Sequence, residues 1–134
     1  MNSELKAVKE FYTGCGIQDQ LQDSPTPFIE QRIKDLRIRL IAEEFEELKT
    51  GIKEENIVEI ADALADLLYV IHGTTLAFGL QNHMRKIYEE VHFSNMSKMV
   101  GGVKIDEGGK MLKGPLYFRP RISEILGSPY NEGI

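Results

Sequence analysis

Apolar residues recur at helical spacing along most of the chain. They follow one helical face from 28 to 49, and they dominate a second helical run from 54 to 78. Gly51 predicts the end of the first helix and Gly79 the end of the second, so a short link joins them as an antiparallel hairpin. Thr26 and Pro27 fit the N-cap and first turn of the first helix. Shorter helices are expected at 2–12 and 82–95.

The pattern changes beyond residue 98. Glycines separate short segments there, which predicts a loop or a small β-hairpin. A tail at 114–120 follows, and then a last short helix at 122–126. We therefore expect one all-α domain over residues 1–134, a helical bundle with a glycine-rich C-terminal appendage.

Two acidic clusters lie inside the paired helical patterns. Leu36, Leu40, Glu43 and Glu47 step by four, three and four, so the acids continue an apolar stripe. Glu44 borders this stripe, whereas Glu46 falls on the outer side and is expected to be solvated. In the following helix the residues that step by three, four and three are Glu59, Asp62, Asp66 and Tyr69. The two acidic lines should converge across the hairpin, with Glu47 facing a residue near Glu59 or Asp62.

Carboxylates among apolar neighbours are costly to bury unless positive charge meets them. Arg37, Arg39 and Lys34 lie beside the stripe, but they are too few to neutralise both lines. A hard divalent cation such as Mg²⁺, with Mn²⁺ as a substitute, is the simplest partner for convergent carboxylates. A carboxylate left outside the ligand set could take a proton from an attacking water. This pattern indicates phosphate chemistry, although a run of acids by itself usually marks a solvated helix face.

Composition limits the partners and the cellular location that we expect for this protein. The chain has 134 residues and a net charge of −5, which favours neither a nucleic-acid polymer nor an anionic membrane as partner. The longest apolar stretch carries Asp62 and Asp66, which argues against a membrane span. Cys15 is the single cysteine and the N-terminus lacks an apolar signal-peptide core. We therefore expect a cytoplasmic protein.

The acid pattern E-E-x-x-E followed by E-x-x-D resembles the all-α nucleoside triphosphate pyrophosphohydrolases, the MazG-like superfamily. The similarity continues through residues 62–70, 73–74, 91–98 and 109–115, and it spans roughly residues 28 to 120. This longer pattern looks like the phosphoribosyl-ATP pyrophosphohydrolase-like branch, which includes dUTP-preferring members. The shared acidic positions are Glu43, Glu44, Glu47, Glu59 and Asp62.

The resemblance implies a Mg²⁺-dependent cut between the α and β phosphates of a nucleotide, with dUTP or another non-canonical or surplus deoxynucleotide as the best guess. Its products would be a monophosphate and pyrophosphate, a role in cleaning the nucleotide pool. By this resemblance the metal ligands are Glu44, Glu47, Glu59 and Asp62, and Glu43 orients or deprotonates the attacking water. It also implies a dimer or tetramer, in which a partner's helices complete a four-helix core.

The C-terminal segment suits a phosphate-binding role. Its lysines supply donors beside glycines, which let the backbone approach a phosphate closely. We expect the substrate contacts to come from Asp66, Asn95, Lys98, Lys110 and Lys113. Tyr117 or Phe118 either stacks on a base or anchors the tail at 114–120, and we favour the anchor.

Two other functions fit the same acids. One is a di-iron or di-manganese carboxylate protein assembled across a dimer, although only one E-x-x-H motif, Glu89 to His92, is present. The other is a non-catalytic helical dimer whose acids form salt bridges or bind a basic partner.

Overall fold

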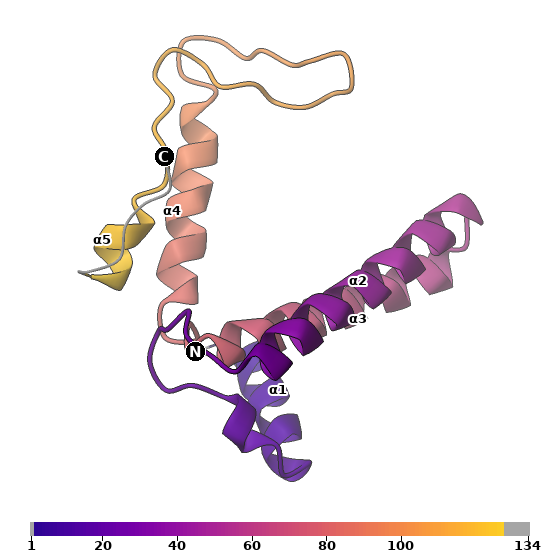
Figure 1. Cartoon of the computed structure of the whole chain (residues 1–134). Coiled ribbons are helices and arrows are strands. Elements are labelled where there is room, and N and C mark those ends of the chain that lie inside the picture. The colour runs from indigo at the N-terminus through magenta and orange to yellow at the C-terminus, as the bar shows by residue number, and fades with distance from the viewer. Residues whose placement is uncertain (1, 128–134) are drawn as a thin grey trace. The chain divides into compact units, whose positions relative to one another are not determined.

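A computed structural model describes residues 2–127 of the chain. Within that range the backbone forms five α-helices and one 3-10 helix, and no strand (Figure 1). The elements in order are α1 (Ser3–Gly14), η1 (Gln18–Gln20), α2 (Gln31–Lys53), α3 (Ile57–Ala77), α4 (Met84–Ser97) and α5 (Ile122–Leu126). An isolated antiparallel bridge joins Ile105 to Met111. The all-α prediction is therefore confirmed. Of the two expected forms of the glycine-rich segment, the described residues form a loop that is closed by this one bridge.

The chain divides into two compact units, Met1–Asn82 and His83–Ile134. The first holds α1 to α3, and its main feature is the antiparallel α2–α3 hairpin (Figure 1). The second holds α4, the glycine-rich segment and α5. The expectation of a single domain over residues 1–134 stays a prediction.

The link between α2 and α3 lies at 54–56, later than expected. Glu55 adopts a left-handed conformation with φ of 53°, and the Asn56 side chain accepts hydrogen bonds from the backbone N–H groups of Val58 and Glu59. This cap fixes the start of α3. Because the turn follows Lys53 instead of Thr50, every residue of α2 faces a position farther along α3 than the expected turn implied.

The interpretation of Gly51 as a helix stop is wrong. Gly51 is buried inside α2, and a Cβ placed there would lie 3.2 Å from the backbone nitrogen of Ile60. Its small size lets the two helices approach closely, which is a packing role and not a capping role. The expected start of this helix is also wrong. The Thr26 hydroxyl accepts from the Phe28 N–H at 3.0 Å and so stabilises a local turn, while α2 begins at Gln31.

Helix α1 packs against the hairpin through a buried cluster made of Leu5, Val8, Tyr12 and Leu76. Helical spacing from Leu5 and Val8 allows either Phe11 or Tyr12 to lie on the inner side of α1. Tyr12 is the buried one, whereas Phe11 is 52% exposed.

A buried arginine ties α1 to both helices of the hairpin. The Arg37 guanidinium donates to the Tyr12 hydroxyl, to the Thr74 hydroxyl at 3.1 Å and to the Val70 carbonyl at 2.8 Å. Arg37 is only 2% exposed, and none of these partners is a carboxylate. The hydrogen bonds, together with the Tyr12 ring, whose centroid lies 5.6 Å from the guanidinium carbon, therefore compensate for a desolvated charge.

In the second unit, the tail lies along α4. The Ser94 hydroxyl donates to the Phe118 carbonyl at 2.7 Å, and the Phe118 N–H donates to the Ser97 hydroxyl at 3.1 Å. The Glu90 carboxylate accepts from the backbone N–H of Arg121 at 3.1 Å and from its guanidinium at 3.3 Å. Phe118 thus anchors the tail, but through its backbone.

The Glu90 contacts predict acid-sensitive attachment of the tail. The Arg121 backbone N–H, with help from its guanidinium, lowers the pKa of Glu90 below its ordinary value of 4.5. The stabilisation is complete above pH 4.5 and is lost as the pH falls through the lowered pKa. The protection of the Arg121 amide against hydrogen exchange, taken relative to the intrinsic exchange rate at each pH, should therefore fall below pH 4.5. In Glu90→Gln this pH step should disappear; an unchanged step in that variant would exclude Glu90 as its source.

Candidate metal centre

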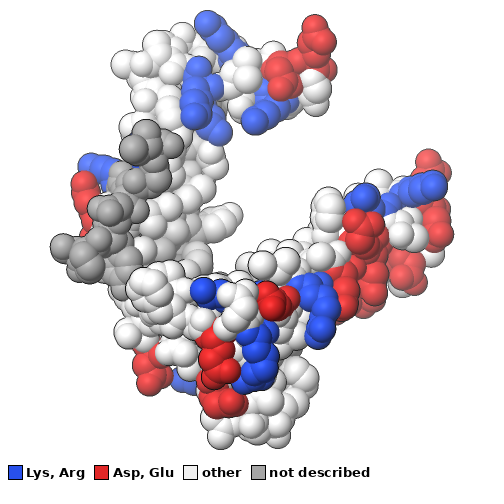
Figure 2. Space-filling view, in the orientation of Figure 1, with Lys and Arg blue, Asp and Glu red and all other residues white. Residues whose placement is uncertain are grey.

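Three carboxylates converge at the centre of the hairpin. Glu44 and Glu47 of α2 and Asp66 of α3 each offer an oxygen, and these oxygens all lie within 4.8 Å of one another. Glu44 and Asp66 are half-buried and Glu47 is exposed. The late turn explains why Asp66, two turns beyond Glu59 on α3, joins this group. Figure 2 shows acidic side chains gathered along the same hairpin.

The electrostatics of this group fit a divalent cation. One Glu44 oxygen, Oε2, is buried and has no hydrogen-bond partner among the described residues. Burial raises the pKa of Glu44 above its ordinary value of 4.5, and the negative charges of Glu47, Asp66 and Asp62 raise it further. A divalent cation would reverse these effects, because it favours the ionised form and supplies the missing partner. Protonation of Glu44 and cation binding therefore compete.

The acids outside this group are arranged differently. Glu43 is exposed and pairs with Arg39 at 3.8 Å, and Glu46 is exposed and pairs with Lys49 at 3.3 Å. We find no ion pair to Glu44, Glu47 or Asp66 in the part of the chain that the structure describes. The expectation that neighbouring bases cannot neutralise both acidic lines fits these pairings, since Arg37 bonds elsewhere.

Glu59 lies nearer the turn than the three converging acids. It lines an open groove of about 360 Å³ together with Glu47, Thr50, Gly51 and other residues of the turn region. Glu47 therefore reaches both this groove and the carboxylate group. Asp62 lies between Glu59 and Asp66 on α3, and its charge acts on Glu44.

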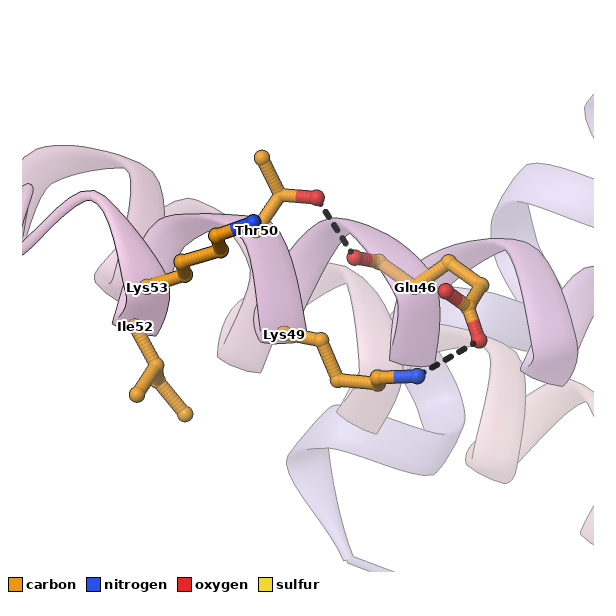
Figure 3. A pocket seen from close by; sticks show the side chains of 5 residues that line it. All are labelled: Glu46, Lys49, Thr50, Ile52 and Lys53. Carbon is orange, nitrogen blue, oxygen red and sulfur yellow. Dashed lines mark hydrogen bonds and ion pairs between the residues drawn. The ribbon is translucent and has the colours of Figure 1, made fainter.

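A second concavity lies on the outer side of α2 and holds no acid of the converging group (Figure 3). Its volume is about 420 Å³, and Glu46 bonds there to Lys49 while the Thr50 hydroxyl donates to the Glu46 carbonyl at 3.1 Å. The expected solvated position of Glu46 agrees with this surface pairing.

Four of the expected substrate contacts lie in the second unit. Asn95 and Lys98 end α4 and lie one turn apart. Lys110 is exposed in the hairpin turn, where the Asp106 carboxylate accepts from its backbone N–H at 2.8 Å. The Lys113 ammonium lies 5.0 Å from the centre of the Tyr117 ring. Asn95, like Lys110, is exposed.

Sequence reasoning did not single out an aromatic pair next to the acids. The rings of Phe11 on α1 and Tyr69 on α3 meet edge to face, with centroids 5.8 Å apart. Desolvation, followed by the nearby Tyr12, raises the pKa of Tyr69 above its ordinary value of 10.0. The spacing of Tyr69 from Asp62 and Asp66 was the available signal, but the contribution of α1 depends on tertiary packing.

Comparison with known proteins agrees with the acid pattern. A curated protein of Acanthamoeba polyphaga mimivirus, uncharacterized protein L479, is 47% identical over 45 residues, which cover 34% of this chain and 18% of the viral protein. No helix among residues 2–127 is both long and apolar enough to cross a membrane. The family model for phosphoribosyl-ATP pyrophosphohydrolase matches residues 8–95, about two thirds of the chain and all of the hairpin acids. The chain therefore belongs to the phosphoribosyl-ATP pyrophosphohydrolase family.

Proposed function

We propose that this protein hydrolyses a nucleoside triphosphate between the α and β phosphates and releases pyrophosphate. The observation that carries the proposal is the group formed by Glu44, Glu47 and Asp66, with its buried and unpartnered Glu44 oxygen. Family membership supports pyrophosphohydrolase chemistry in general terms. As substrate we propose dUTP or another non-canonical or surplus deoxynucleotide.

Mg²⁺ fits this donor set, because the group consists of carboxylate oxygens and contains no histidine or thiolate among the described residues. When bound, Mg²⁺ would neutralise phosphate charge and bring a water close to phosphorus. We assign Glu44, Glu47 and Asp66 as its first holders. Asp62 and Glu59 extend the ligand set along α3, toward the turn.

The remaining acids and bases take the other roles. Glu43 is exposed one helical position from Glu44, and we assign it to orient and deprotonate the attacking water. Its pairing with Arg39 leaves the carboxylate accessible, since both side chains are more than half exposed. We assign Asn95, Lys98, Lys110 and Lys113 to the substrate phosphates, as hydrogen-bond donors.

A panel of canonical and modified nucleoside triphosphates with Mg²⁺ tests this proposal. The products should be the nucleoside monophosphate and pyrophosphate, without orthophosphate. Mn²⁺ should support turnover, and removal of the divalent ion should abolish it. Failure to form pyrophosphate from every nucleotide in the panel would exclude the proposed function.

Self-association is also part of the proposal. Exposed apolar residues recur every seven positions on α2 and again on α3, and each is between 42% and 74% exposed. Heptad spacing keeps side chains on one helical stripe and is typical of helices that pack against partner helices. The residues are Ile38, Phe45 and Ile52 on α2, and Ile57, Leu64 and Ile71 on α3. Two copies that meet through these stripes would form a four-helix core.

Leu64→Glu should separate the copies, because it places a charge within the apolar stripe of α3. Light scattering after size exclusion should show at least two copies for the wild type and one for the variant. Phe28→Glu is the matched control, because Phe28 is 87% exposed but lies outside both stripes. A monomeric wild type, or a variant that keeps the wild-type mass, would contradict the proposed core.

A further inference from the structure

Phe11 and Tyr69 form an exposed aromatic surface in the first unit. Phe11 is 52% exposed and Tyr69 39% exposed, although their rings are in edge-to-face contact at an interplanar angle of 74°. Edge-to-face pairs normally contribute to cores or interfaces, where both rings lose contact with water. A paired but exposed surface of this kind therefore suits a ligand that is itself flat and aromatic.

The pair lies on the acid side of α3. Tyr69 follows Asp62 by seven residues, or two turns, and follows Asp66 by three, so all three lie along one side of the helix. The apolar stripe of α3 lies on a different side of the helix. Because each residue turns the helix by about 100°, Leu64 and Tyr69, five residues apart, point in directions that differ by about 140°. A partner copy that covers the stripe therefore leaves the aromatic pair beside the acids.

The neighbouring Tyr12 fixes the position of Phe11. Its hydroxyl accepts a hydrogen bond from the buried Arg37 guanidinium, and its ring centroid lies 6.0 Å from that of Phe11. Arg37 also bonds to Thr74 and Val70 of α3. The helix that carries Phe11 is thus fastened to the helix that carries Tyr69, and the stacking surface is formed before a ligand arrives.

We propose that Phe11 and Tyr69 form the nucleobase subsite of this protein. The inference rests on the proposed function, because phosphates that are held through a divalent cation at Glu44, Glu47 and Asp66 would place the rest of the nucleotide along the same side of α3. A base then stacks on the aromatic surface about one turn from Asp66. Stacking accepts every base, since each has a π-face, so selection between bases falls to other residues.

The test compares two ligands that differ in the base. With Mg²⁺ present, calorimetric titrations use the non-hydrolysable α,β-methylene analogue of dUTP and, separately, inorganic tripolyphosphate. The wild type should bind the nucleotide on the order of tenfold more tightly than tripolyphosphate. Phe11→Ala should lose this preference without weaker tripolyphosphate binding, and Phe11→Leu should lose most of it. Tyr69→Phe should keep it, because the ring remains.

Phe28→Ala is the matched control, and it should leave both affinities unchanged, because it removes an exposed phenylalanine of the same unit. Aromatic side-chain NMR provides a second readout, in which the nucleotide, but not tripolyphosphate, should shift the Phe11 and Tyr69 resonances. Equal affinities for the two ligands in the wild type, or an unaltered preference in Phe11→Ala, would overturn the subsite. If the subsite fails this test but pyrophosphate is still released from nucleotides, the proposed function stands. If the protein binds the nucleotide selectively but releases no pyrophosphate, only the proposed hydrolysis is overturned.

Discussion

Replacing Glu47 by glutamine should abolish pyrophosphate release without unfolding the protein. Its oxygen lies within 4.8 Å of those of Glu44 and Asp66, so the substitution removes a charged ligand and keeps the size of the side chain. Substitutions of residues that only support the metal ligands commonly lower metal affinity or activity about 10- to 100-fold. Because Glu47 is a proposed ligand, we expect turnover to fall at least about 100-fold. Measuring the turnover rate with saturating nucleotide at several Mg²⁺ concentrations tests this loss.

Glu47→Gln should raise stability when metal is absent and reduce the gain in stability that Mg²⁺ gives. Without metal, the loss of one of three neighbouring negative charges should stabilise the fold by up to about 1 kcal/mol, because water screens the exposed Glu47. With Mg²⁺ at about 100 times its dissociation constant, the wild type should gain about 2.7 kcal/mol, and the variant much less. Thermal unfolding with and without Mg²⁺ separates these two contributions.

Glu46→Gln is the matched control for both measurements. Glu46 is the preceding residue, but its exposed carboxylate pairs with Lys49 and does not belong to the converging group. Glu46→Gln should therefore keep the wild-type activity. Its Mg²⁺-dependent gain in stability should differ from that of the wild type by no more than about 0.5 kcal/mol, the usual effect of a surface substitution. Equal losses in the two variants would contradict the assignment of Glu47 to the metal.

Gly73→Ala should cost about 3 kcal/mol of folding free energy. A Cβ at this position would clash with the Arg37 guanidinium and the Tyr12 hydroxyl. Arg37 is buried, so any shift breaks hydrogen bonds of a desolvated charge, at about 1–3 kcal/mol for each donor left unpaired. The clash outweighs the gain of about 1 kcal/mol that alanine normally brings to a helix.

Urea unfolding followed by circular dichroism measures this loss, and two other glycines calibrate it. Gly14 ends α1 with no atom within 4 Å of a built Cβ, so Gly14→Ala should stabilise the fold by up to about 1 kcal/mol. Gly51→Ala should fall between them, since its nearest atom would be 3.2 Å away. A Gly73→Ala variant as stable as the wild type would show that the Arg37 network does not hold α1 in place.

Local pattern was sufficient for much of the fold. The helical periods around the hairpin and around 82–95 predicted helices that the structure contains, because a buried helix face needs apolar residues every three or four positions. Apolar spacing also predicted the short C-terminal helix. The acids were predicted less well. Glu43 and Glu47, which the pattern placed on the core stripe, are exposed, whereas Glu44, expected at the border of the stripe, is half-buried.

Local pattern failed where one residue type serves two purposes. A glycine after a helical run looks the same whether it ends the helix or lets another helix approach, and Gly51 does the second. The consequence reaches the candidate site, because the position of the turn sets which residues of α3 lie opposite Glu44 and Glu47. The late turn brings Asp66 into their group, so a residue expected to contact substrate becomes a proposed metal holder.

The sequence alone therefore determined the helices, the two acidic lines and the family to which they belong, because these depend on residue spacing within single segments. Only the tertiary structure decided the register of the hairpin and the choice between Phe11 and Tyr12. Adjacent residues on a helix differ by about 100° in direction, so the pattern of α1 allows either ring to turn inward. The buried Arg37 on α2 selects Tyr12, because only a tyrosine hydroxyl can accept its hydrogen bond, and Phe11 is left beside Tyr69.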